Sequence, residues 1–494
     1  MFLRKSSLFW NIFQVSESSC NEKRKNIVLT NSGFCVNNKS ERGMYMFTKV
    51  RLQNFRSFKD ITFDLSDTKN KYKNFAMVYG ENGVGKSNLI SGFEALIHLM
   101  RTMDIRDALD KLLLSEKLRV LLESSGDSDV LLTKITSGFR DAESLSQQFR
   151  TVDCDEPMSI EYEFIVNNKK GSYLVEIEKE IIHERLEYVL EKNKGVYFDI
   201  TPERQKINDK VFENVQALAK TKELMEQYWG KHTLLAILFH EKNDKSERYM
   251  SKALSDNFLH LISQFLSVSC LNKTGDGERG SLLASDQLMT NLEEGTISKS
   301  QEQKLDAAAQ MLTELFHSIN SDNRKLFYKK AMIDDNRIKY KLFLTKYIAG
   351  RERDIDFTLE STGNHQILHI LPFLLLAMQG NVVFVDELDS GIHDLLIKEI
   401  IESALPVIKA NNGQLVITSH NTYLMEMSDA RSSVYIIKDD DSGNRIVQCI
   451  DNSGKGRIYE QNSIRNQYIH GKYEGIPNKF NIDIHKIINF LNNN

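Results

Sequence analysis

A glycine-rich run at residues 80–87 has the residue types needed to bind a polyphosphate. The run reads Gly80-Glu81-Asn82-Gly83-Val84-Gly85-Lys86-Ser87. Glycines allow the backbone angles that point successive N–H groups inward at phosphate oxygens. Lys86 would reach the β- and γ-phosphates of a nucleoside triphosphate, and the Ser87 hydroxyl would coordinate Mg²⁺. The run matches the P-loop pattern in full, so we predict that it binds ATP together with Mg²⁺.

The elements needed to position this run flank it on the correct sides. Phe75–Tyr79 is a short apolar run of the kind that forms a buried strand. After Ser87, apolar residues recur at helical spacing, at Leu89, Phe93, Leu96, Ile97 and Met100. A helix that begins near Lys86 would present its N-terminus to the same anion. A glycine-rich turn that occurs by chance would not need a strand before it and a helix after it. The order of strand, loop and helix therefore favours a phosphate-binding site.

A pair of acids follows a buried strand much later in the chain. Val382–Val385 is entirely apolar, and Asp386 and Glu387 come directly after it. This is the arrangement of a Walker B strand. Asp386 would hold Mg²⁺, and Glu387 would polarise the water that attacks the γ-phosphate. A buried strand with an acidic exit turn is the other interpretation, and the complete P-loop makes the catalytic one stronger.

A histidine occupies a comparable place after the next apolar run. Residues 415–418 indicate a buried strand, and Ser419 and His420 follow it. A histidine at a strand end, taken alone, is more often a surface residue than a catalytic one. Its interpretation therefore depends on the wider pattern of the chain.

The periodicity of the chain predicts an α/β fold in three parts behind a poorly ordered leader at residues 1–43. Residues 44–200 would form an N-terminal ATPase lobe with the P-loop and antiparallel β hairpins, since apolar residues alternate around residues 162–177. Residues 201–345 would form a mostly helical insertion. Residues 346–494 would form a C-terminal ATPase lobe that shares a mixed sheet with the first lobe.

The composition excludes several other classes of protein. The 494 residues are 41% hydrophobic and 27% charged, with a net charge of −4, which is typical of a globular protein. The longest apolar run, residues 367–378, is too short to span a bilayer. The five cysteines have no metal-ligand spacing. We therefore expect a cytoplasmic protein without a membrane partner.

Taken together, these motifs resemble the ABC ATPases of the SMC, RecF and OLD type. The resemblance also includes Asn54-Phe55-Arg56-Ser57-Phe58 near the start and Asp386-Glu387-Leu388-Asp389. It implies an ABC-type P-loop ATPase head that hydrolyses ATP, with His420 as the switch histidine at the γ-phosphate. It also implies that Arg56 approaches the nucleotide phosphates and that Asp389 lies in the D-loop at a dimer interface.

The same resemblance identifies a signature loop before a predicted helix. The family pattern is Leu-Ser-Gly-Gly-Gln, and this chain has Glu360-Ser361-Thr362-Gly363-Asn364, which agrees at Ser361 and Gly363. In the family this loop contacts the γ-phosphate bound to a second protomer. The resemblance therefore implies a homodimer or a higher homo-oligomer. Gln147 and Gln148 are candidates for the family's Q-loop glutamine, whose position the sequence does not fix.

A closer similarity is to stand-alone bacterial ATPases of anti-phage defence systems, the RloA, AbiL, PARIS and PtuA types. Ile182-His183-Glu184-Arg185-Leu186 and the segments 464–471 and 475–477 carry it. It implies a sensor or regulator of a separately encoded toxin or nuclease. The alternative is a RecF-like DNA-maintenance ATPase that acts on DNA ends or gaps.

Two further features have competing interpretations. Asp439-Asp440-Asp441 precedes Ser-Gly and is typical of a hairpin turn rather than a metal site. The basic stretches 69–73, 324–330 and 337–353 contain or adjoin aromatic residues and could contact DNA. Because acids interleave with them, a solvated helical face is the favoured interpretation.

Overall fold

The structure is a computed structural model of the chain. It describes residues 45–67, 72–113, 140–190, 192–244, 253–274, 277–281, 287–428, 430–440, 442–452 and 463–476. The expected leader at 1–43 lies outside these residues.

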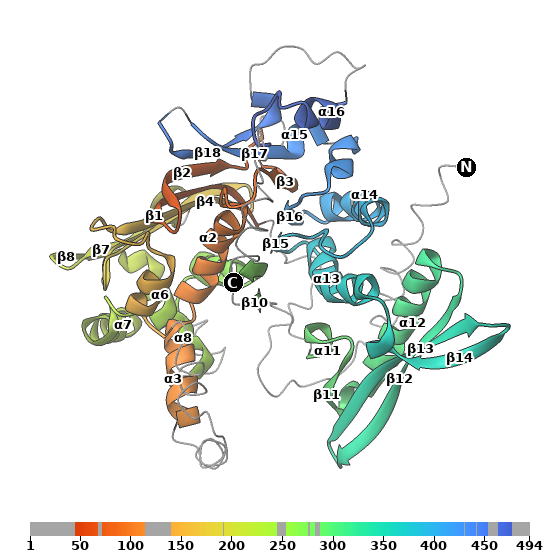
Figure 1. The fold of residues 1–494 in the computed structure, drawn as a ribbon. Helices are drawn as coiled ribbons and strands as arrows, with labels where there is room; N and C mark the ends of the chain where they lie inside the picture. The colour runs from red at the N-terminus through yellow and green to blue at the C-terminus, as the bar shows by residue number, and fades with distance from the viewer. Residues whose placement is uncertain are drawn as a thin grey trace, which may run out of the picture.

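A seven-stranded sheet forms the centre of the fold (Figure 1). Its order is β10 (Gly277–Ser281), β9 (Val268–Thr274), β15 (Val382–Val385), β16 (Gln414–Thr418), β3 (Phe75–Tyr79), β17 (Val434–Asp439) and β18 (Arg445–Cys449). The strands from β9 to β17 are parallel, and the two edge strands are antiparallel to their neighbours. Every residue of β3, β15 and β16 is buried, as expected for parallel strands covered on both faces.

Alternate residues of these strands belong to two different hydrophobic cores. Ala76 and Val78 of β3 pack with the helix α2 (Lys86–Leu99), whose Phe93 stacks on Phe384 with ring centroids 3.7 Å apart. Met77 packs on the other side with α13 (Thr362–Met378) and α14 (Asp394–Ala410). The sheet is therefore a layer between α2 on one face and α13 and α14 on the other.

A second sheet of seven strands is antiparallel throughout. Its order is β2 (Phe58–Asp64), β1 (Tyr45–Phe55), β4 (Met158–Val166), β5 (Lys169–Ile177), β6 (Ile181–Val189), β7 (Lys194–Thr201) and β8 (Arg204–Ile207). Asn167 and Asn168 both have positive φ, 49° and 62°, which suits the two-residue turn between β4 and β5. The expected antiparallel subdomain and the α/β class are confirmed.

Helices pack around this second sheet. They are α3 (Thr102–Leu113), α6 (Ala142–Phe149), α7 (Val215–Tyr228), α8 (Leu234–Asp244) and α10 (Asp256–Phe265). Short 3-10 turns occur at η1 (Asp209–Val211), η2 (Lys299–Gln301), η3 (Phe357–Leu359), η4 (Thr422–Glu426) and η5 (Ile450–Asn452). Of the helices in the described ranges, none is long and apolar enough to cross a membrane.

The stretch 201–345 contains more strand than the sequence suggested. β9 belongs to the central sheet, and a third, antiparallel sheet is built from β11 (Glu294–Ser298), β12 (Asn323–Asp334), β13 (Arg337–Ile348) and β14 (Arg351–Asp356). α11 (Gln287–Thr290) and α12 (Glu302–Ile319) accompany this sheet. The basic stretches 324–330 and 337–353 therefore lie mainly on strands and not on the helical face that we favoured. The reason is the alternation of buried and exposed residues along β13, which the many lysines and arginines obscure in the sequence.

The chain after β16 returns to the central sheet. β17 and β18 form a hairpin, preceded by α15 (Ala430–Ser433) and followed by α16 (Ile464–Ile469). The ring of Tyr468 in α16 lies 5.8 Å from that of Tyr79, the last residue of β3. The C-terminal segment therefore contacts the strand that leads into the P-loop.

Candidate active site

The loop between β3 and α2 has a backbone that only glycine adopts easily. Gly83 and Gly85 have φ of 79° and 110°, in the region that disfavours side chains. A Cβ added to Gly85 would lie 2.7 Å from the ring of Phe58, so the space is closed as well. The predicted strand, loop and helix are present, and α2 begins at Lys86 as expected. Phosphate binding by Glu81, Asn82 and the other loop residues stays a prediction.

The ammonium of Lys86 is held inside this loop. Its Nζ donates to the carbonyl oxygens of Gly80 and Glu81, both at 3.0 Å, and the residue is only 7% exposed. Burial lowers the pKa of Lys86, and attraction to Asp386 and Glu387 partly offsets this. The P-loop lysine and the acids after β15, about 300 residues apart in sequence, therefore meet in space.

Asp386 combines full burial with an unsatisfied oxygen. Its Oδ1 accepts a hydrogen bond from Thr418 Oγ1 at 2.5 Å, while its buried Oδ2 has no hydrogen-bond partner among the described residues. Burial raises the pKa of Asp386, and the Thr418 and Ser87 hydroxyls lower it. Ser87 is therefore beside the carboxylate, and the metal that the two groups would share stays a prediction.

These two groups fit Mg²⁺, which proteins bind through one or two oxygen ligands plus substrate phosphates. The orphaned Oδ2 of Asp386 is an anionic oxygen without a proton donor, and a cation beside it would offset the cost of its burial. Within the described part of the chain, no cluster of three or more His, Cys, Asp or Glu could hold a metal. A magnesium held by Ser87, Asp386 and phosphate oxygens needs no such cluster.

Glu387 has a strained backbone held from two sides. Its φ is 45°, which is uncommon for a residue with a side chain. Its N–H donates to Thr418 Oγ1 at 2.8 Å, and Lys273 Nζ donates to its carbonyl at 3.4 Å. Strained residues persist where the surroundings hold them, and they cluster at functional sites. The predicted role of Glu387 in activating water agrees with this position.

Asp389 and His420 are also brought together. The His420 N–H donates to Asp389 Oδ2 at 3.2 Å, and Asp389 Oδ1 is buried without a hydrogen-bond partner among the described residues. The loops after β15 and β16 therefore meet at this end of the sheet, as parallel strands require. The predicted catalytic role of the exposed His420 side chain stays a prediction.

The proposed signature loop caps α13. Ser361 is exposed, and its Oγ accepts from the Asn364 N–H at 3.3 Å as the helix N-cap. A Cβ on Gly363 would lie 3.1 Å from the Gly391 carbonyl oxygen, just after Asp389. The contact of this loop is therefore with the predicted D-loop of the same chain.

Arg56 lies beside the first turn of α2. Its Nη1 donates to Asn88 Oδ1 at 3.3 Å, and its guanidinium lies 5.0 Å from the centre of the Phe149 ring. Phe149 ends α6, which also contains Gln147 and Gln148. This places Arg56 next to the predicted phosphate-binding helix, and the roles of Gln147 and Gln148 stay predictions.

A family model described as AAA ATPase domain matches residues 46–425, more than half of the chain. The chain belongs to the AAA ATPase domain family. The ATPase domain expected from the sequence is confirmed at the level of this family. No protein of curated function matches the sequence.

Solved structures with similarity to this ATPase domain include SMC heads. The SMC head domain of Thermotoga maritima has 13% identity and a TM-score of 0.34, covering 82% of this chain and 98% of its own. An SmcHead bound to the C-winged helix domain of ScpA has 12% identity and a TM-score of 0.37, covering 81% and 96%. A Smc head bound to the C-terminal domain of ScpA, derived from Pyrococcus furiosus, has 13% identity and a TM-score of 0.33, covering 82% and 96%.

Three residues of the ATPase domain lie at this site that were not predicted from the sequence. Thr418 bonds Asp386 and Glu387 at once, and its place at the end of a buried parallel strand could have signalled it. Lys273 ends β9, a strand that we had placed in the insertion. Arg445 of β18 donates from Nη1 to the carbonyls of Gly83 and Val84 at 3.1 and 2.5 Å. No sequence signal links Arg445 to the loop.

The acidic run after β17 behaves as a turn in the ATPase domain. Asp440 Oδ1 accepts from the N–H groups of Ser442 and Asn444 at 2.9 and 2.8 Å. β17 and β18 pair as an antiparallel hairpin around it, which confirms the hairpin interpretation. Asp441 lies outside the described residues.

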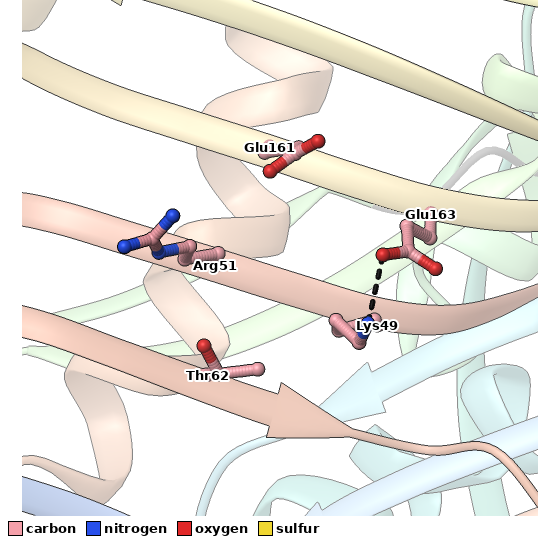
Figure 2. Close-up of a pocket in the computed structure, with 5 residues that line it drawn as sticks. All are labelled: Lys49, Arg51, Thr62, Glu161 and Glu163. Atoms are coloured by element: carbon pink, nitrogen blue, oxygen red, sulfur yellow. Dashed lines mark hydrogen bonds and ion pairs between the residues drawn. The ribbon is translucent and has the colours of Figure 1, made fainter.

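A charged hollow of about 290 Å³ on the second sheet is separate from this site (Figure 2). It is lined by Lys49, Arg51, Thr62, Glu161 and Glu163. Lys49 Nζ is 2.8 Å from Glu163 Oε1, and Arg51 pairs with Asp60 outside the hollow. Because these cations already have anionic partners and none of the predicted site residues lines it, we assign the hollow no role in nucleotide binding.

Proposed function

We propose that this chain binds ATP with Mg²⁺ at the P-loop and hydrolyses it. The observation that carries the proposal is the convergence of Lys86 with Asp386 and Glu387, acids delivered by a strand far along the sequence. An ammonium group, a hydroxyl and a carboxylate with a free oxygen are the groups that a magnesium–triphosphate complex requires.

Each residue has a defined part in this chemistry. Lys86 and the loop N–H groups would bind the β- and γ-phosphates, and Ser87 and Asp386 would hold Mg²⁺. The metal, when bound, would supply neutralisation of the phosphate charge. Glu387 would orient the attacking water and accept its proton, and the hydrogen bond from its N–H to Thr418 fixes where its side chain starts.

Two substitutions separate binding from hydrolysis. Lys86→Ala should abolish ATP binding because the loop loses its cation. Glu387→Gln should keep binding and lower phosphate release at least about 100-fold, the usual contribution of a general base. ATP binding is measured with a fluorescent ATP analogue, and turnover by phosphate release. Exposed Glu402→Gln on α14 is the matched control. Wild-type turnover by Glu387→Gln would remove our assignment of the water-activating residue.

We also propose that two copies of the chain enclose ATP between them, as a homodimer or within a larger homo-oligomer. The signature loop supports this because Ser361 is exposed at the N-terminus of α13, where N–H groups favour an anion. Leu359, two residues before Ser361, is an apolar residue that is 77% exposed. Apolar side chains next to an anion-binding loop suit a surface that a second protomer covers.

The proposed biological role is that of a cytoplasmic sensor or regulator in an anti-phage defence system, acting through a separately encoded toxin or nuclease. The sequence resemblance in the segments 475–477 and 464–471 motivates it. Tyr468 of that segment packs against Tyr79, and its hydroxyl donates to the Gly475 carbonyl at 3.0 Å. A segment in contact with the P-loop strand is well placed to pass the nucleotide state to a partner.

An affinity capture tests the partner. The full chain and its Glu387→Gln variant are isolated from host cells before and after phage infection, and bound proteins are identified by mass spectrometry. A toxin or nuclease whose retention differs between the two forms or between the two conditions supports the role. Recovery of replication and repair proteins alone would support the alternative, a RecF-like DNA-maintenance ATPase. The observation that favours this alternative is a cationic, aromatic face on the third sheet.

A further inference from the structure

The third sheet has one face against its helix and one face exposed. Leu326 and Tyr328 of β12, and Ile338, Tyr340 and Leu342 of β13, are buried in the core that includes α12. Alternate residues must point the other way. The residues opposite each other on that outer face are Lys325 and Thr345, Phe327 and Phe343, Lys329 and Lys341, and Ala331 and Lys339. Figure 1 shows this sheet at the side of the molecule away from α3 and α7.

Aromatic rings lie in the middle of this outer face. Phe327 and Phe343 stack with centroids 5.9 Å apart and planes inclined by 27°, and both are only half-buried. Tyr347 is four residues further along β13 on the same side and is 44% exposed. Outward aromatic rings on a sheet gain little from folding, because their apolar area stays partly in water.

Cations surround these rings. Lys329 Nζ lies 3.8 Å from the centre of the Phe343 ring, and the Arg324 guanidinium lies 5.5 Å from that of Tyr347. Lys341 is neutralised by Asp356 at 2.6 Å. Lys325, Lys329 and Lys339, in contrast, have no ion pair with any acid in the described part of the chain.

The sheet retains these charges at a cost. Lys329 lies directly opposite Lys341 on the neighbouring strand, where like charges are destabilising, and the ion pair of Lys341 with Asp356 reduces this repulsion. Acids of the face lie on the neighbouring strands β14 and β11: Asp356 holds Lys341, Asp354 accepts the Thr345 hydroxyl at 2.7 Å, and Glu352 and Glu294 lie opposite Tyr347 and Lys341. The β12 side is therefore a strip of positive charge around exposed aromatic rings.

We propose that the outer face of β12 and β13 binds single-stranded DNA. Bases would stack on Phe327, Phe343 and Tyr347, and Lys325, Lys329 and Lys339 would contact phosphates. Stacking platforms bordered by cations are the general way in which proteins hold single strands. The Thr345 hydroxyl beside the rings donates its proton to Asp354, so it could offer a 2′-hydroxyl only an acceptor and no donor, which favours DNA over RNA.

The test measures binding of a fluorescent thymidine oligonucleotide to the full chain by anisotropy. No ATP is added, so a failure to bind the oligonucleotide would leave the ATPase proposal untouched. The combined variant K325E, K329E and K339E should weaken binding at least about 30-fold at low salt. Because each phosphate contact contributes about 0.7 to the slope of log K against log salt for single strands, this slope should fall by about 2. K206E makes the same type of charge change at an exposed lysine of β8 and should bind like wild type.

The aromatic contribution is tested separately. F343L keeps an apolar side chain and should lower affinity about fivefold or more without changing the salt slope. Thermal melting checks that each variant is folded, and the K325E, K329E and K339E variant changes only exposed side chains. The proposal is overturned if the wild type does not bind the oligonucleotide, if K206E weakens binding as much as the triple variant, or if duplex DNA or a uridine oligonucleotide binds more tightly.

Discussion

The hydroxyl of Thr418 is hydrogen-bonded to Asp386 at 2.5 Å while it accepts the N–H of Glu387 at 2.8 Å. The Thr418 side chain, from β16, therefore determines which oxygen of Asp386 is available to ligate the metal. It also holds the backbone of Glu387, the residue that would activate water. Asp386 Oδ1 is committed to Thr418, which leaves Oδ2 as the oxygen available to a cation.

Thr418→Val should lower ATP turnover by about 10- to 100-fold, the usual effect of removing a partner of a metal-binding group. The shape of the residue is kept, but Asp386 loses a donor and Glu387 loses the acceptor of its N–H. The affinity for ATP should change less than turnover, because Lys86 and the loop are untouched. Steady-state phosphate release and ATP titration measure the two quantities. Thr418→Ser retains the hydroxyl and should recover most of the activity; equal loss in both variants would contradict this role.

Arg445→Met should weaken ATP binding about tenfold, comparable to the loss of one or two charge-assisted hydrogen bonds. Arg445 holds the carbonyls of Gly83 and Val84, and a peptide whose carbonyl points one way points its N–H the other way. The N–H groups of Val84 and Gly85 are thereby directed away from Arg445. Asp439→Asn is the control, because it breaks only the ion pair with Arg445 Nε. Unchanged affinity in Arg445→Met would show that the loop keeps its shape unaided.

Mixing two inactive variants tests whether each site is shared between protomers. Lys86→Ala lacks a working P-loop, and Ser361→Arg should block the signature loop. In an equal mixture half of the dimers are mixed, and each mixed dimer has one intact site of two, so activity should return to at most about a quarter of wild type. Phosphate release from the mixture and from each variant alone is the measurement. If the mixture stays as inactive as its components, the proposal that two protomers share each ATP site is wrong.

Glu184 predicts a specific pH dependence of stability. Its buried carboxyl accepts hydrogen bonds from Leu234 N–H and Trp229 Nε1 at 2.7 and 2.9 Å, and burial raises the pKa of Glu184 from 4.5 to about 7. The folded chain holds this proton more tightly than the unfolded chain. The resulting stability is complete below about pH 4.5, and it is lost as pH rises through about 7.

Glu184→Gln should remove this pH dependence of the free energy of unfolding. For a pKa shift of this size, the dependence amounts to on the order of 3 kcal/mol. Melting temperatures between pH 5 and 8 measure it, with exposed Glu203→Gln as the control for a general charge effect. A wild-type slope that persists in Glu184→Gln would place its origin in another group.

The parts of the fold that were predicted correctly depend on local pattern. The P-loop at 80–87 and the strand before Asp386 each contain their own signal, since uninterrupted apolar runs indicate buried parallel strands. β9 has no such signal, because Ser269 and Asn272 are fully buried polar residues in its middle. Asn272 is accommodated by Ser91 and Glu94 of α2, at 2.7 and 2.6 Å. Partners so distant cannot be inferred from a window of neighbouring residues.

The candidate active site also divides into residues that a local pattern predicts and residues that only tertiary contacts reveal. The residue types at Lys86 and Glu387 identify their chemistry, but the positive φ of Glu387 results from contacts with Thr418 and Lys273. Arg445 reaches the loop from 361 positions away along the chain. Residues that position a site through tertiary contacts have no required sequence spacing, so the pattern alone does not reveal them.

The place of β3 between β16 and β17 has a consequence for how the protein is made. The two neighbours of the strand before the P-loop are synthesised more than 300 residues after it. Pairings so remote in sequence form slowly and leave strand edges open meanwhile. A nascent chain that still lacks β16 and β17 therefore has the phosphate-binding motif but no sheet to hold it, and we expect nucleotide binding only after both strands have been synthesised.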